Sequence, residues 1–145
     1  MPLISKNIQE KYGKSEFFSL ETNLLDFSVL SRSSLLISDW SGVSLEYSFA
    51  FNLPVIFIDV KKKVLNFDYK DLDIEPIEIS IRNKIGKIVS EAKLDNIIQE
   101  VEDCICNFSQ NNDHIDKLKR EMIFNIGSAD IVAGEKLLEI SNVNM

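Results

Sequence analysis

The sequence has few positive charges for its size. Its 145 residues include 16 lysines and arginines against 23 aspartates and glutamates, which gives a formal net charge of −7. Because nucleic-acid binders usually carry a basic face, this balance argues against nucleic acid as a partner. The same deficit argues against strong unaided attachment to anionic membranes.

Long hydrophobic runs are also absent from the sequence. No apolar run approaches the ~20 residues that cross a bilayer, and residues 1–14 lack the hydrophobic segment of a signal peptide. We therefore expect a cytoplasmic protein. There is no internal repeat and no low-complexity linker, so residues 1–145 are predicted to form a single domain.

Cysteine and histidine are scarce. The two cysteines, Cys104 and Cys106, agree with a reducing compartment. They lie two apart in a predicted helix and so point to different sides, which argues against a mutual disulfide or a shared metal. We interpret both as small core-facing residues. The single histidine, His114, lies in a late helical pattern and is not expected to be catalytic. No metal cluster, Walker loop or nucleophile–His–acid set is found.

The most informative stretch is Ser34–Val60. It contains two dense apolar runs, Leu35–Ile37 and Val55–Ile58, separated by the polar turn SDWSG and a segment of about one helix's length. Strand, turn, helix and strand in this order are typical of a βαβ unit. Pro54 ends the helix that is predicted over Gly42–Asn52, because proline disfavours helix at the preceding residue.

The remaining elements support an α/β fold. The predicted elements are a partly loose N-terminus over residues 1–14, a strand at Glu16–Leu20, a helix from Thr22 or Asn23 to Ser31, a loop over Lys61–Pro76, an edge strand at Ile77–Ile81, a long helix capped by Ser90, a helix capped by Asp113 and closed by Gly127, and a last helix capped by Ser128. The pattern predicts a three-layer domain with a small, mostly parallel sheet and C-terminal helices. So few strands indicate a missing portion or a partner chain.

The turn between the first apolar run and its helix is the expected ligand site, because ligands of such sheets lie beyond the carboxyl ends of the strands. Ser41 and Gly42 stand where the helix begins. Its first amides lack internal partners, which suits a phosphate. Glu46 lies one turn further on the same face, where a carboxylate could accept hydrogen bonds from a ribose diol. The combination predicts a nucleotide site.

Simpler interpretations stay open for these residues. Ser41 could be only an N-cap, and Asp39 only a turn residue that bonds its own backbone. Glu46 could form a salt bridge with Arg32 or Arg82, and Arg82 could instead reach a diphosphate.

Two interpretations also stay open for each of two further sets of side chains near the turn. Lys61–Lys63 could attract phosphates or belong to a solvated loop. Trp40 and Tyr47 could stack on a base, although core packing is favoured for both.

The same stretch resembles the CDP-glycerol glycerophosphotransferase family, which builds teichoic acids and related surface polymers. The resemblance lies in an apolar strand followed by Asp39-Trp40-Ser41-Gly42, an acidic residue five positions after the serine (Glu46), and the run from Pro54 to Asp59. Gly86-Lys87-Ile88-Val89 before a long helix, and Phe124-Asn125-Ile126-Gly127 before a last helix, also fit. The likeness runs from about Asn23 to Ile140.

This resemblance implies a Rossmann-like, partial GT-B C-terminal domain that binds a nucleotide-activated donor such as CDP-glycerol as substrate, without a cofactor or metal. Ser41 and the Gly42 amide would hold the donor diphosphate, Glu46 would meet the ribose, and Asp39 would shape the turn. The acceptor domain, which supplies the catalytic base in the family, would be a missing N-terminal partner. We therefore expect no transfer by this chain alone, and at most peripheral association of the parent protein with the inner face of the membrane.

Two other functions remain open. UDP-N-acetylglucosamine 2-epimerases share a similar turn in the same kind of domain, so a UDP-sugar glycosyltransferase or epimerase domain is one alternative. Alternatively, the chain is a non-catalytic domain in which the incomplete sheet edges pair two copies into a homodimer.

Overall fold

The computed structural model describes residues 2–23, 27–61, 75–108 and 113–143. Its contacts divide the chain into two units, residues 1–33 and residues 34–145, each of which is described by itself. Most of the predicted loop, including Lys62 and Lys63, lies outside the described residues, as do Leu24 and Leu25 of the first predicted helix.

In its described residues, the first unit contains the helices α1 (Pro2–Tyr12) and α2 (Ser28–Arg32). The prediction that residues 1–14 are partly loose was wrong for α1, which contains no internal glycine or proline and places Lys6 and Glu10 one turn apart at 3.8 Å. The strand predicted at Glu16–Leu20 was also wrong. Its apolar side chains find no sheet, and Phe17 is 93% exposed.

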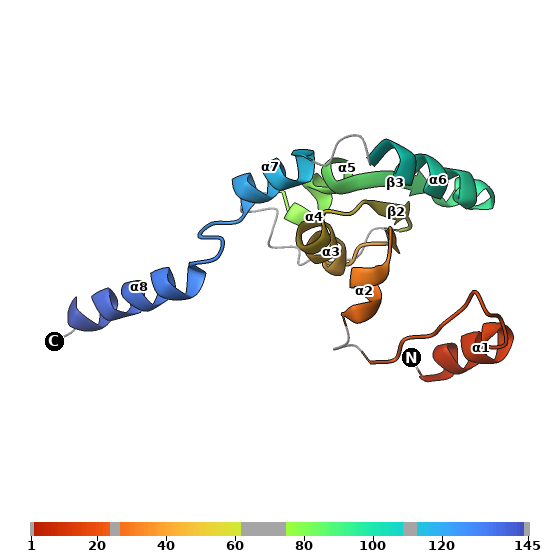
Figure 1. Cartoon of the computed structure of the whole chain (residues 1–145), viewed down its shortest axis with the longest axis horizontal. Coiled ribbons are helices and arrows are strands. Elements are labelled where there is room, and N and C mark those ends of the chain that lie inside the picture. Colours follow the sequence, from red (N-terminus) through yellow and green to blue (C-terminus); the bar gives the residue numbers. More distant parts are fainter. Residues whose placement is uncertain (1, 24–26, 62–74, 109–112, 144–145) are drawn as a thin grey trace. The chain divides into compact units, whose positions relative to one another are not determined.

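The second unit is built on a three-stranded parallel sheet in the order β1 (Leu36–Ser38), β2 (Val55–Asp59) and β3 (Gly86–Ser90). Leu36 pairs with Val55 across the first interface, and Val55 pairs with Gly86 across the second. The two longer strands lie side by side in Figure 1. This arrangement confirms the α/β class and the small parallel sheet.

Between β1 and β2 the chain forms α3 (Val43–Phe51), close to the predicted bounds. Asn52 ends the helix in the left-handed region (φ 52°) and donates its backbone N–H to the Ser48 carbonyl at 2.9 Å. The Asn52 side chain also donates to Asp116 at 3.0 Å and so connects α3 to α7 (Asp113–Met122). Pro54 then leads directly into β2.

The core lies on both sides of β2. Ile56 and Val89 pack with Cys104 of α6 (Ile97–Phe108), and Ile97 and Val101 of the same helix cover this cluster. Successive side chains of a strand alternate between faces, so Phe57 points the other way. The second cysteine, Cys106, is exposed, so the prediction of a core position holds for Cys104 alone.

The segment before β3 differs from its prediction. Ile77–Ile81 was predicted as an edge strand, but Ile77–Ser80 forms the short helix α4, followed by α5 (Arg82–Ile85). The isoleucines of this segment alternate with polar residues, but they also recur every fourth residue, which is a helical spacing. In the helical arrangement Ile81 is 3% exposed and Ile85 is fully buried. Tertiary burial therefore decides between the two patterns.

The C-terminal half is helical, as predicted, with shifted boundaries. Ser90 caps no helix through its side chain, and residues 91–96 form a 3-10 helix, η2 (Glu91–Asn96), ahead of α6. The helix α7 ends before the expected Gly127, which adopts φ +79° in the turn before α8 (Ala129–Val143). Among the described helices, none is both long and apolar enough to span a bilayer.

Candidate functional site

The turn after β1 is fixed by its aromatic residue. The Trp40 indole Nε1 donates a hydrogen bond of 3.1 Å to the Val60 carbonyl, just beyond the end of β2. Because β1 and β2 are parallel and adjacent, this bond ties together the segments that follow their carboxyl ends. Asp39, Ser41 and Gly42, which flank Trp40 in the turn, are all exposed. The predicted residues of the turn therefore form an accessible edge on an anchored loop.

The N-terminus of α3 has no side-chain cap. The Ser44 and Leu45 amides bond to the carbonyls of Ser41 and Gly42, at 3.2 and 3.0 Å. The amides of Gly42 and Val43 find no acceptor among the described residues. Ser41 is therefore not a side-chain N-cap here, and two donors at the positive end of the helix dipole stay free.

The space beside Gly42 is open. A Cβ added to this residue would meet no atom within 4 Å. A ligand can therefore approach the backbone at the start of α3 without displacing a described side chain. The position is exposed at the carboxyl edge of the sheet, which is where parallel sheets bind ligands.

Glu46 lies in a neighbouring depression and not beside the free amides. It lines a groove of about 590 Å³ together with Lys119 and Met122 of α7, whereas Ser41 and Gly42 line a narrow crevice with Trp40. Leu45 lines both. The carboxylate is exposed and forms no ion pair with a described residue of the second unit.

Arg82 is buried beneath the turn. Its side chain is 4% exposed and bonds through Nη1 to Asp59 Oδ1 at 3.1 Å, while Nη2 lies 3.5 Å from the Ile58 carbonyl. The guanidinium also stacks 3.9 Å from the centre of the Trp40 ring. Its pairing with Asp59 replaces the expected alternative of a bond to Glu46. These contacts indicate that Arg82 positions Trp40. A direct contact between Arg82 and a phosphate stays a prediction.

Two features of this site were missed at the sequence level. One is the Arg82–Trp40 stack, which joins residues 42 positions apart and leaves no signal in local spacing. The other is Ser44, which lines the crevice and is 2% exposed, with a hydroxyl that has no partner among the described residues. The only sign of this role in the sequence was the position of Ser44 in the first turn of the predicted helix.

The remaining candidates are Lys61, Tyr47 and the residues that lie outside the described part of the chain. Lys61 is exposed, and Tyr47 is 1% exposed and packs on Phe51, which confirms the core interpretation of this tyrosine. Within the described part of the chain, no three histidine, cysteine or acidic side chains come together in a way that could hold a metal ion.

The chain was compared with models of protein families, with curated proteins and with solved structures, and none of them matches it. The assignment of a function therefore depends on the chemistry of the β1–α3 turn and on the resemblance carried by its sequence.

Proposed function

We propose that the β1–α3 turn binds the diphosphate of a nucleotide-activated donor. We further propose that the chain is the donor-binding part of a CDP-glycerol:polyol-phosphate glycerophosphotransferase-like enzyme of surface-polymer synthesis. The observation that carries the proposal is the uncapped start of α3, where the Gly42 and Val43 amides are free and the space beside Gly42 is open. Helix N-termini of this kind bind phosphate through amide donors and the helix dipole.

The arrangement of the turn supports a ligand that is longer than a single phosphate. The amides of α3 and the Ser41 hydroxyl would bind the diphosphate, while Glu46 lies one turn further in the adjoining groove. A ribose in that groove could donate both hydroxyls to the carboxylate, which forms no ion pair with a described residue of its unit. Asp39 shapes the turn, and Arg82 holds Trp40 in place from below.

The fold is compatible with this function. We propose that α3 and α6 cover opposite faces of the sheet in a three-layer, Rossmann-like arrangement related to the C-terminal domain of GT-B transferases.

In the transfer, an acceptor hydroxyl would attack the β-phosphorus of CDP-glycerol, a new P–O bond would form, and CMP would leave. The base that takes the proton would come from outside this chain, so that the chain contributes positioning and charge stabilisation.

A nucleotide panel tests this proposal. The chain holds one tryptophan, Trp40, so its fluorescence reports directly on the turn. We expect CDP-glycerol to bind more tightly than CMP, and Ser41→Ala and Glu46→Ala each to weaken binding about fivefold or more, as expected for a lost hydrogen bond to a charged group. Glu102→Ala, an exposed change on α6, is the matched control. A preference for UDP-sugars would favour the glycosyltransferase or epimerase alternative.

A different observation favours association as a second candidate function. Five apolar side chains of α8 are between 39% and 68% exposed: Ile131, Val132, Leu137, Leu138 and Ile140. Such a helix is normally covered by a partner. Light scattering after gel filtration checks this candidate. A homodimer that Leu137→Glu converts to a monomer would support it, and a monomeric wild type would count against self-association.

A further inference from the structure

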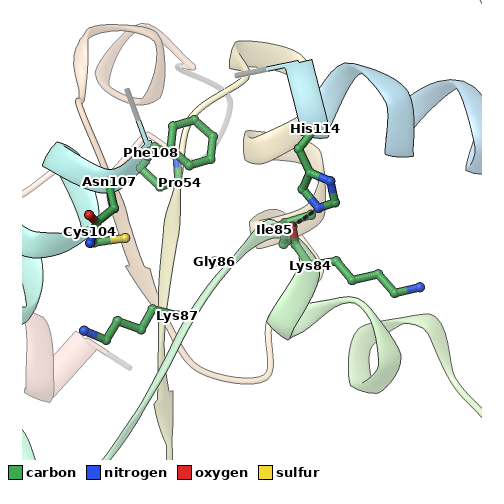
Figure 2. Close-up of a pocket in the computed structure, with 9 residues that line it drawn as sticks. All are labelled: Pro54, Lys84, Ile85, Gly86, Lys87, Cys104, Asn107, Phe108 and His114. Carbon is green, nitrogen blue, oxygen red and sulfur yellow. Dashed lines mark hydrogen bonds between the residues drawn. The ribbon is translucent and has the colours of Figure 1, made fainter. Parts of the chain in front are cut away.

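A cavity of about 440 Å³ lies at the amino ends of β2 and β3, between the start of these strands and His114 (Figure 2). Its lysines offer it no free charge. Lys87 pairs with Glu100, and the Lys84 side chain leads away from the cavity, as Figure 2 shows. A buried polar group without a partner among the described residues lies instead in the narrow crevice of the β1–α3 turn.

This group is the hydroxyl of Ser44, which lines the crevice from the first turn of α3. The residue is 2% exposed, and its Oγ has no hydrogen-bond partner among the described residues. Buried polar groups are nearly always bonded, because burial of a hydroxyl without a partner costs free energy. The Ser44 hydroxyl is therefore available to a group that enters the crevice from outside.

The crevice has room for one small group. Its volume is about 10 Å³, close to the space that one water-sized group needs. The exposed carboxylates of Asp39 and Glu78 also line it. An ionised carboxylate can only accept hydrogen bonds, so a group that fits these walls must donate them. An alcohol hydroxyl can do so, whereas a phosphate oxygen cannot and is repelled by both carboxylates.

The rest of the crevice is apolar. Its walls include the side chains of Leu45, Phe57, Ile81 and Ile85, of which the last three are at most 3% exposed. A hydrogen bond between such walls is stronger than one in water, because the surroundings are less polarisable. The lining therefore suits a hydroxyl on a carbon chain.

The crevice adjoins the free amides at the start of α3, since Ser41 and Gly42 line it. Leu45 separates it from the groove that contains Glu46. We propose that the crevice binds one hydroxyl of the polyol that a nucleotide donor carries, and that Ser44 selects a polyol over a plain alkyl group. This inference rests on the proposed donor site and extends it to the transferred group. The diphosphate stays on the amides outside the crevice.

A matched pair of ligands isolates this contact. CDP-glycerol and the n-propyl ester of CDP have the same charge and chain length and differ only in the two free hydroxyls of the glycerol. Trp40 lines the same crevice and is the single tryptophan of the chain, so its fluorescence reports both titrations. We expect the wild type to bind CDP-glycerol about tenfold more tightly, which corresponds to about one hydrogen bond.

Two buried serines supply matched variants. Ser48 lies one turn after Ser44 on α3, is fully buried and also has an unpartnered hydroxyl, but it is not among the described residues that line the crevice. Ser44→Ala should lower the preference for CDP-glycerol to about twofold, and Ser48→Ala should leave it near about tenfold. Neither change should lower the urea midpoint of the unliganded chain, because each removes a buried hydroxyl that has no described partner.

The outcomes separate this inference from the donor site on which it rests. Equal binding of the two esters, with Ser41→Ala weakening both, would keep the diphosphate site and overturn the polyol contact. Equal effects of Ser44→Ala and Ser48→Ala on the preference would also overturn it, because the effect would then come from the packing of α3. Absence of binding by either ester would overturn this inference together with the proposed function.

Discussion

Replacement of Gly86 by alanine probes the tightest contact of the sheet. Gly86 begins β3 opposite Val55, and a Cβ there would overlap the Val55 carbonyl oxygen and lie 2.7 Å from its carbonyl carbon. Ordinary contacts begin at 3.4 Å, and the carbonyl oxygen lies closer to this Cβ than the carbonyl carbon does, so the two strands must move apart by clearly more than about 0.7 Å. The backbone of Gly86 is extended (φ −174°), so the strain comes from this contact and not from its dihedral angles.

The expected cost is about 1–3.5 kcal/mol. Overpacking of a well-packed site costs about 1–3 kcal/mol, and a weakened hydrogen bond between β2 and β3 adds about 1 kcal/mol. Alanine also lowers the entropy of the unfolded chain, which offsets roughly 0.4–1 kcal/mol. Since domains are stable by about 5–15 kcal/mol, Gly86→Ala should stay folded with a clearly lower stability.

Urea unfolding followed by Trp40 fluorescence measures this effect. With a slope of about 1–3 kcal/mol/M, a cost near the middle of this range should lower the midpoint by about 1 M. Gly134→Ala is the matched control, because a Cβ at Gly134 meets nothing within 4 Å and alanine favours the helix α8. A Gly86→Ala midpoint equal to that of the wild type would refute the close approach of β2 and β3.

Three further predictions concern side chains. Arg82→Lys keeps the charge but loses the stack on Trp40 and the planar fork, so the free energy of unfolding should fall by about 1–2 kcal/mol and Trp40 emission should shift; unchanged emission would speak against the stack. At pH 8, Cys106 should react with iodoacetamide about tenfold faster than Cys104, because Cys106 is exposed and burial raises the pKa of Cys104; equal rates would contradict this. The hydrogen bond to Glu100 raises the pKa of Lys87. The contribution of this hydrogen bond to the free energy of unfolding is complete below the unfolded pKa of about 10.4 and is lost as pH rises through the higher pKa of the folded state. Lys87→Met should therefore reduce the loss of stability at alkaline pH, whereas Lys93→Met should not.

The elements around the turn were predictable because their local signals agree with their burial. The apolar run at β2 is continuous and its first three residues are buried, as expected of a strand covered on both faces. The run at β1 also forms a strand, but Ile37 is 48% exposed, so the expected cover on both faces is wrong for β1. Pro54 together with Asn52 ends α3 close to its predicted place. The start of α3 could also be predicted from the local sequence. Ser41 and Gly42 stand at the change from strand to helix in any assignment of this segment.

Other parts depend on contacts that no local pattern records. Ile77–Ile81 fits both a strand and a helix, and burial of Ile81 against the core selects the helix. The separation of Glu46 from Ser41 into two depressions follows from the packing of α7 on α3, which is set by residues more than 60 positions away. The cavity beside His114 likewise joins segments that span residues 54–114.

The most direct test of the nucleotide site is the chemical shift of the backbone amides. Titration of the 15N-labelled chain with CDP-glycerol should move the Gly42 and Val43 amide signals most, because these two donors are free at the start of α3. Ser41→Ala should weaken the response without moving it elsewhere. Shifts confined to other segments, such as Lys84–Lys87, or no shift at all with any nucleotide, would contradict binding of a diphosphate at this turn.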